Sequence, residues 1–160
     1  MLLHIKGSNK YNRKLVEAAT WWYADKLMGK RLMSGLEIHI NLRKNLIDKE
    51  DCEGTATWED DYCDRPKEFT IELDVTYSIR DALITLAHEM VHIKQWAKDE
   101  MYEYMNVAGL VRFKGEKFHM EITDYWDYPW EIEAYGKQLG LFVRFCEHMG
   151  FEREDMKEDA

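Results

Sequence analysis

Residues 78–98 read SIRDALITLAHEMVHIKQWAK, and this stretch decides the expected fold because it specifies one long amphipathic helix. Ser78 can cap the first turn by accepting from free backbone amides, and Asp81 complements the positive end of the helix dipole. At about 100° per residue, one broad face is apolar: Ala82, Leu83, Leu86, Ala87, Met90 and Val91. The opposite face is polar: Asp81, Thr85, His88, His92 and Gln95. We therefore expect the polar face to point away from the main core and toward another polar group.

The helix contains the pattern H-E-x-x-H, from His88 to His92, with both histidines on its polar face. Two histidines four residues apart lie one turn apart on the same side of a helix, so both imidazoles can reach one tetrahedral metal ion. Glu89 lies beside them, where it can take a proton from a water molecule whose pKa a metal lowers to about 7. The pattern arises by chance in roughly one chain of this length in a few hundred. The competing interpretation is two surface histidines on an amphipathic helix.

A catalytic zinc site normally has three protein ligands and one open position, so a third ligand is required. One extended pattern places a glycine and a histidine three and six residues after His92. That pattern is absent, because those positions are Gln95 and Lys98. The next histidine, His119, lies far downstream. The third ligand is therefore expected from a later helix.

A final helix is predicted from Pro129 to about Met149, with Gly150 as its stop. Its expected apolar stripe is Ile132, Tyr135, Leu139, Phe142, Cys146 and Met149. Glu131 lies about 40° from the centre of this stripe, where a carboxylate needs a partner such as a metal. Glu133 lies on the opposite face and is expected to be a solvent-exposed charge. Glu131 is the predicted third ligand, with Glu133 as the open alternative; the other interpretation of Glu131 is a first-turn carboxylate favoured by the helix dipole.

Periodicity elsewhere predicts an α+β chain. A first helix spans about Lys10 to Met28 and stops at Gly29. Three segments alternate between apolar and polar residues and are expected to form one antiparallel sheet with a solvated face: Leu36–Leu42, Gly54–Glu59 and Phe69–Val75. A hairpin is expected within Val111–Ile122, around Lys114 and Gly115. Residues 1–151 are expected to form a single domain, and the charged residues 152–160 a disordered tail.

The amino-acid composition argues against some classes of function. The chain has 160 residues, a net charge of −9 and 46% hydrophobic residues, as in an ordinary soluble domain. The acidic balance argues against sequence-independent nucleic-acid binding, which needs a basic surface. Three cysteines without C-x-x-C spacing indicate reduced thiols in a cytoplasmic protein. No signal-peptide core or membrane-spanning run is expected from the sequence, which does not indicate an oligomeric state.

These motifs resemble those of small zincin metallopeptidases of the gluzincin type. In that group a later helix adds a glutamate to the H-E-x-x-H helix, often in an E-x-x-A-D context, and residues 131–135 read EIEAY. The order of helix, strands and active-site helix resembles a minimal zincin fold over roughly Tyr11 to Met149, a size shared with bacterial and bacteriophage peptidases called SprT-like. The chain lacks the basic or zinc-binding additions of SprT-like proteins that act on DNA-bound substrates, so a DNA-repair role is not expected.

The resemblance departs from the pattern at Tyr135, where the family aspartate usually supports a metal-binding histidine. Tyr135 itself, or one of three aspartates, could take that role: Asp74, Asp124 and Asp127. Peptide hydrolysis also needs a group that stabilises the oxyanion. The local candidates are His119, Tyr125 and Tyr128.

We expect a zinc-dependent metallopeptidase in which His88, His92 and Glu131 bind Zn²⁺ and Glu89 is the general base. Its partner would be a peptide or protein substrate, held by strand addition at the edge of a short strand. Three alternatives stay open. They are a metal-dependent amidase or esterase for non-peptide substrates, a zincin-fold interaction module without turnover, and a structural domain with two exposed histidines.

Overall fold

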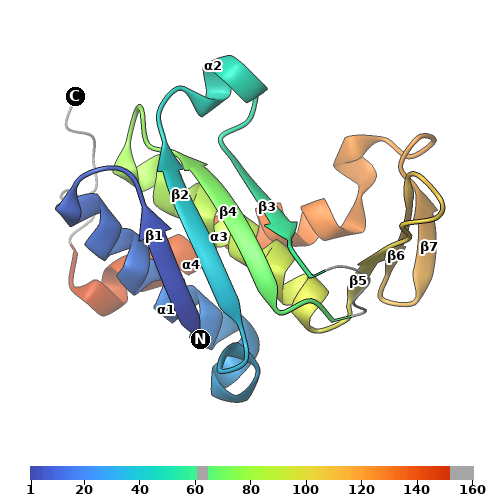
Figure 1. Cartoon of the computed structure of the whole chain (residues 1–160), viewed down its shortest axis with the longest axis horizontal. Coiled ribbons are helices and arrows are strands. Elements are labelled where there is room, and N and C mark those ends of the chain that lie inside the picture. Colours follow the sequence, from blue (N-terminus) through green and yellow to red (C-terminus); the bar gives the residue numbers. More distant parts are fainter. Residues whose placement is uncertain (61–64, 152–160) are drawn as a thin grey trace.

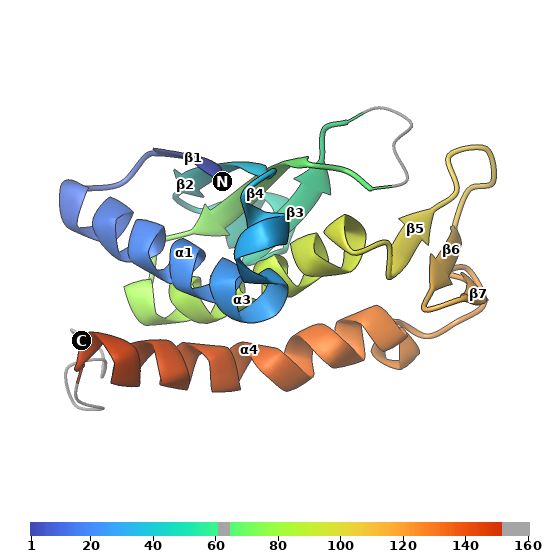
Figure 2. The same ribbon diagram turned by 90° about the horizontal axis from the view of Figure 1, so that it is seen from below.

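A four-stranded sheet forms one layer of the computed structural model, which describes residues 1–60 and 65–151. The predicted tail, residues 152–160, lies outside the described residues. The first half of the chain consists of β1 (Leu2–Lys6), α1 (Lys10–Met33), β2 (Glu37–Arg43), α2 (Leu46–Glu50), β3 (Gly54–Trp58) and β4 (Glu68–Asp74). Helices α1 and α3 (Ile79–Ala97) lie on one face of the sheet, and α4 (Pro129–Met149) lies beneath them (Figures 1 and 2). The α+β prediction is confirmed.

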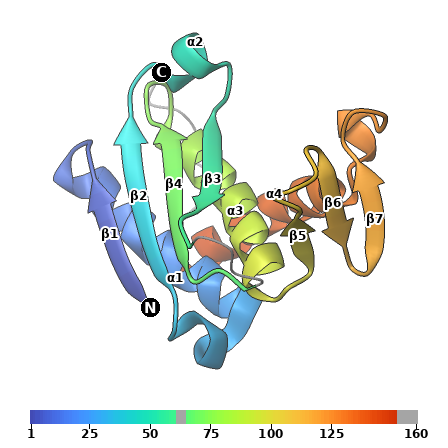
Figure 3. The ribbon, with the colours of Figure 1, turned by 45° about the vertical axis from the view of Figure 1, so that its right-hand side comes forward.

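The strand order is β1-β2-β4-β3, with β1, β2 and β4 parallel and β3 antiparallel to β4. The prediction that the strands form one antiparallel sheet is therefore wrong for β2 and β4. The chain leaves β2, passes to the edge strand β3 and returns antiparallel to it along β4, which makes β4 parallel to β2 (Figure 3). Strand β1, which the sequence analysis missed, is joined to β2 through helix α1 and so runs parallel to it.

The two faces of the sheet differ as predicted. Side chains that point toward the helices are buried: Ile38, Ile40, Leu42, Phe69, Ile71 and Leu73. Those on the outer face are polar and partly exposed: Glu37, His39, Asn41, Glu68, Thr70 and Glu72. Alternation therefore identified the buried face of each strand, although it carries no information about strand direction.

The helix ends follow their local capping residues. The Ser78 hydroxyl accepts from the Asp81 amide at 3.3 Å at the start of α3. Gly150, with φ +72°, ends α4. Gly29 interrupts α1 with a positive φ of 77°, but the helix resumes and ends at Met33, so the predicted stop is an internal break.

A second, three-stranded antiparallel sheet follows α3. It contains β5 (Met101–Glu103), β6 (Leu110–Phe113) and β7 (Glu116–His119). The predicted hairpin is β6–β7, and both turn residues, Lys114 and Gly115, have positive φ, as its tight turn requires. A short 3₁₀ helix, Tyr125–Asp127, then leads into α4. None of the helices in residues 1–60 and 65–151 has the length and apolar character needed to cross a membrane.

Asp74, at the end of β4, anchors the short helix α2. Its carboxylate accepts from the backbone amides of Ile47 at 3.0 Å and Thr76 at 2.7 Å. Burial alone would raise the pKa of this carboxyl group, but the hydrogen bonds outweigh burial and hold it below its usual range.

We predict that Asp74→Asn destabilises the protein by about 1–3 kcal/mol at neutral pH, because one acceptor oxygen becomes an amide donor facing a backbone donor. The lowered native pKa means that the Asp74 contribution exists above the ordinary aspartate pKa and is lost as the pH falls through the native value. The difference between wild type and variant should therefore shrink in acid, as measured by urea unfolding across pH. Asp48→Asn, at an exposed position of α2, is the control. An equal effect of both substitutions would contradict the prediction.

Candidate metal centre

Three potential metal ligands converge between α3 and α4, which run side by side (Figure 2). The Nε2 atoms of His88 and His92 are 3.1 Å apart. The Glu131 carboxylate faces both rings, with one oxygen 3.2 Å from His88 Nε2 and the other 3.5 Å from His92 Nε2. The structure thus brings together the three residues predicted as ligands.

The polar face of α3 is covered rather than open to solvent. His88, Glu89 and His92 are each less than a tenth exposed. The alternative of two surface histidines is therefore wrong. Both histidines face the Glu131 carboxylate on α4, so the expectation that they point toward another polar group is confirmed.

Two glutamines orient the imidazole rings. His88 Nδ1 is 2.8 Å from the side-chain oxygen of Gln138, and His92 Nδ1 is 2.9 Å from that of Gln95. The Gln95 amide nitrogen donates to the Trp130 carbonyl and to Glu133, which fixes the Gln95 oxygen toward His92. Because these oxygens only accept, each Nδ1 is the donor, and a neutral ring then presents an unprotonated Nε2 to the centre.

The convergence is electrostatically favourable only around a positive charge. Two imidazole lone pairs and a carboxylate within about 3.5 Å would repel one another unless a proton or metal ion lies among them. Burial raises the pKa of Glu131, but the bonds to both histidines outweigh it and hold that pKa well below its usual range. Burial lowers the pKa of His92, but Glu131 and the charge of Glu89 raise it above its usual value. Two histidine nitrogens and a carboxylate oxygen form a donor set that suits zinc, so these residues fit such an ion.

Glu89 borders a pocket of about 420 Å³ that is also lined by His88. Burial raises the pKa of its carboxyl group, with a further rise from the charge of Glu131 and opposing effects of His92 and His88. The pocket is lined by residues from the segment that leads into β3, from α3, from the 3₁₀ helix and from α4: Asp51, Cys52, Glu53, Gly54, Asp81, Ile84, Thr85, His88, Glu89, Tyr125, Tyr135 and Gln138. The site therefore combines a buried carboxylate with space for a ligand.

Of the three candidates for oxyanion stabilisation, only Tyr125 lies at the site. Its hydroxyl donates to Glu131 at 3.0 Å. Burial and the bond to the Tyr135 hydroxyl raise its pKa, so the phenol stays protonated and able to donate. Tyr128 is buried and donates to the Met120 carbonyl at 2.8 Å. His119 is exposed at the end of β7, and neither His119 nor Tyr128 lines the pocket.

The structure corrects the predicted faces of α4. Glu133, expected to be a solvent-exposed charge, is only 14% exposed and pairs with the buried Lys94 at 2.6 Å. Burial raises the pKa of Glu133, but the bonds from Lys94 and Gln95 outweigh burial and hold that pKa below its usual value. The residues of α4 that are buried are Trp130, Ala134, Phe142, Phe145 and Cys146. Four residues of the predicted stripe are instead exposed: Ile132, Tyr135, Leu139 and Met149.

The groups that support the histidines are the two glutamines, which the sequence analysis did not assign to that role. The Tyr135 ring packs edge-on against His88, with centroids 4.6 Å apart. Asp74 and Asp124 instead accept hydrogen bonds from backbone amides, those of Ile47 and Trp126, and Asp127 is exposed. Spacing offered a signal, because Gln95 lies three residues after His92 on the same helix face, and Gln138 lies seven residues, or two turns, after Glu131.

Comparisons with protein-family models, with curated proteins and with solved structures each found no match. Any assignment of function therefore rests on the residues of this chain.

The Lys94–Glu133 pair generates a stability prediction. Lys94 is buried and also contacts Glu100, so removing its charge leaves two carboxylates without their cation. We expect Lys94→Met to lower the free energy of unfolding by about 3–5 kcal/mol in urea denaturation. Lys114→Met is the matched control, because the Lys114 ammonium is half-exposed and 3.7 Å from Glu133; its effect should stay below about 1 kcal/mol. Equal losses in the two variants would show that Glu133 is not held by a buried pair.

Proposed function

We propose that the protein is a zinc-dependent hydrolase that cleaves peptide bonds. The observation that carries the proposal is the convergence of His88, His92 and Glu131, with both rings turned by glutamines so that Nε2 faces the centre. Glu89 borders the pocket that His88 also lines. This arrangement supports the likeness to the gluzincin type of metallopeptidase suggested by the sequence motifs.

The proposed chemistry divides between the ion and the side chains. A bound zinc ion supplies Lewis acidity, which acidifies water and polarises a carbonyl group. Glu89 accepts the proton of the attacking water and passes it to the departing amine. Tyr125 provides a hydroxyl donor at the pocket wall for the oxygen of the tetrahedral species. In the structure this hydroxyl donates to Glu131. To stabilise the tetrahedral species it must leave the Glu131 oxygen and donate to the substrate oxygen instead.

The position of β3 favours a peptide substrate. Strand β3 lies at the edge of the four-stranded sheet, and Figure 3 shows it on the side that faces β5–β7. Glu53 and Gly54, where β3 begins, line the pocket beside His88 and Glu89. An edge strand beside the site can pair with an extended peptide through backbone hydrogen bonds. Among the substrates considered, this feature supports peptides over small amides or esters.

Cysteine chemistry supports a cytoplasmic location for the proposed enzyme. Cys52 and Cys146 are free thiols, while Cys63 lies outside the described residues. Reduced thiols are the usual state in that compartment.

Metal content provides the first test. His92→Ala removes one of three ligands, so the variant should hold one zinc equivalent less than wild type after dialysis against zinc and buffer, measured by elemental analysis. His119→Gln, at an exposed histidine away from the pocket, should leave the metal content unchanged. If His92→Ala retains all of the zinc bound by wild type, the three residues do not form the site.

Turnover provides the second test. Glu89→Gln keeps the size of the side chain and removes the base, so zinc content should be retained while peptide cleavage falls by about 10²–10⁴-fold. Cleavage of a defined peptide library in ¹⁸O water, read by mass spectrometry, measures the new carboxyl ends. Glu116→Gln, at an exposed position of β7, is the control. Stoichiometric zinc without cleavage by wild type would instead support an interaction module.

A further inference from the structure

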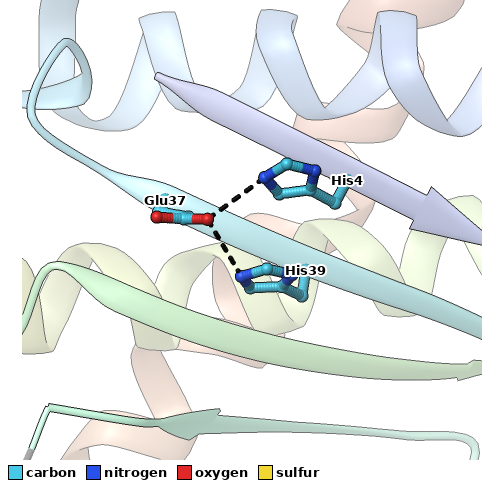
Figure 4. A group of neighbouring side chains, drawn as sticks. All are labelled: His4, Glu37 and His39. Carbon is cyan, nitrogen blue, oxygen red and sulfur yellow. Dashed lines mark hydrogen bonds and ion pairs between the residues drawn. The ribbon is translucent and has the colours of Figure 1, made fainter.

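The outer face of the four-stranded sheet carries a second group of histidines and carboxylates. Parallel pairing places His4 of β1 opposite His39 of β2, and Glu37 of β2 opposite Glu68 of β4. Glu37 and His39 are two residues apart on one strand, so they share a face. This face is opposite to the one covered by α1 and α3, and Figure 4 shows three of the four side chains gathered there. The group is therefore separate from the candidate centre between α3 and α4.

The ligand atoms of this group point toward one another. The Nε2 atoms of His4 and His39 lie 3.1 Å and 3.3 Å from the same oxygen of Glu37 (Figure 4). A Glu68 oxygen is 3.6 Å from His39 Nε2. The two imidazole rings are stacked with centroids 4.7 Å apart and an angle of 14° between their planes. One ligand atom from each of His4, Glu37 and His39 lies within 4.8 Å of the other two.

One of these atoms lacks the partner that its position requires. His39 Nε2 is covered from solvent, although a third of the side chain is exposed, and it makes no hydrogen bond with the described residues. It lies between the carboxylates of Glu37 and Glu68. A covered polar nitrogen without a hydrogen bond is unfavourable, and an ion bound to it would satisfy both the nitrogen and the two negative charges.

We propose that His4, Glu37 and His39 bind a divalent transition-metal ion, with Glu68 as a fourth ligand. Imidazole nitrogens with carboxylate oxygens form a donor set for zinc and for its neighbours nickel and copper. The ligands come from β-strands whose register fixes their spacing, so His4, Glu37 and His39 need only small side-chain shifts, while Glu68 approaches the ion from the side of His39. Because β1 pairs with β2 alone among the described strands, an ion shared by His4 and His39 would also fasten the N-terminal edge strand to the sheet.

Zinc binding by single-site variants tests the proposal. After dialysis at a fixed free zinc concentration, His4→Gln and His39→Gln should each hold one zinc equivalent less than wild type. The zinc-dependent rise in melting temperature should also be smaller in both variants. His119→Gln is the matched control, since it removes an exposed histidine from a strand of the other sheet. His4 and His39 both lie on a partly exposed face, so the metal-free variants should unfold at nearly the wild-type temperature.

A second measurement detects zinc binding in the wild-type protein itself. In NMR spectra of the wild-type protein, zinc should shift the imidazole signals of His4 and His39 and leave those of His119 in place. Unchanged His4 and His39 signals, or variants that retain all of the wild-type zinc, would overturn the proposal. The two candidate sites are told apart by the His92→Ala variant, which should keep the His4-dependent equivalent. If both sites exist, wild type holds two zinc equivalents, of which His92→Ala loses one and His4→Gln loses the other. If only one of the two variants loses zinc, the site changed in that variant is supported and the other is rejected.

Discussion

The position of α4 depends on the polar groups that α3 buries beneath it. His88, Glu89, His92, Lys94 and Gln95 are all less than a tenth exposed, and unpaired burial of such groups would cost several kcal/mol each. The first turns of α4 supply partners for four of them: Glu131 for the two histidines, Glu133 for Lys94, and the Trp130 carbonyl with Glu133 for Gln95. A helix that slid or rotated against α3 would break several of these interactions together. Polar pairing thus sets the register of the two helices, and apolar packing farther along α4 completes it.

This constraint explains why the faces of α4 were misjudged from sequence. Apolar residues occur on more than one side of the helix, so a stripe through Ile132, Leu139 and Met149 was as regular as the buried one. A carboxylate such as Glu133 is usually exposed, and its burial here depends on the position of Lys94 on another helix. Glu131 faces both histidines, although the apolar stripe that led to its prediction as a ligand is not the buried face. Both glutamates near the start of α4 meet α3, Glu131 at the histidines and Glu133 at Lys94.

Local signals predicted the ends of α3 and α4, the β6–β7 turn and the paired histidines, because each depends on residues that are near one another in sequence. Ser78, Pro129 and Gly150 act through their own backbone neighbours, and the spacing of His88 and His92 follows from one helical turn. Strand direction could not be predicted in this way. Alternation in β2 and β4 is the same whether they run parallel or antiparallel, and the outcome depends on where β3 is inserted. The His4–His39 group was hidden for the same reason, since it exists only through the parallel register of β1 and β2.

The two histidine groups differ in surroundings more than in donor atoms, and that difference separates their proposed roles. His88, His92 and Glu131 lie between two helices, and His88 lines a pocket together with Glu89 and Tyr125. An enclosed site strengthens electrostatic interactions and holds a base and a hydroxyl donor near a substrate. His4, His39, Glu37 and Glu68 have between a third and a half of their side chains exposed on an open sheet face. Water competes for every interaction on this open face. The proposed role of the group is therefore limited to binding an ion and fastening an edge strand. The proposed catalysis is accordingly placed at the enclosed group, where the same ligand chemistry is combined with the proposed base, Glu89.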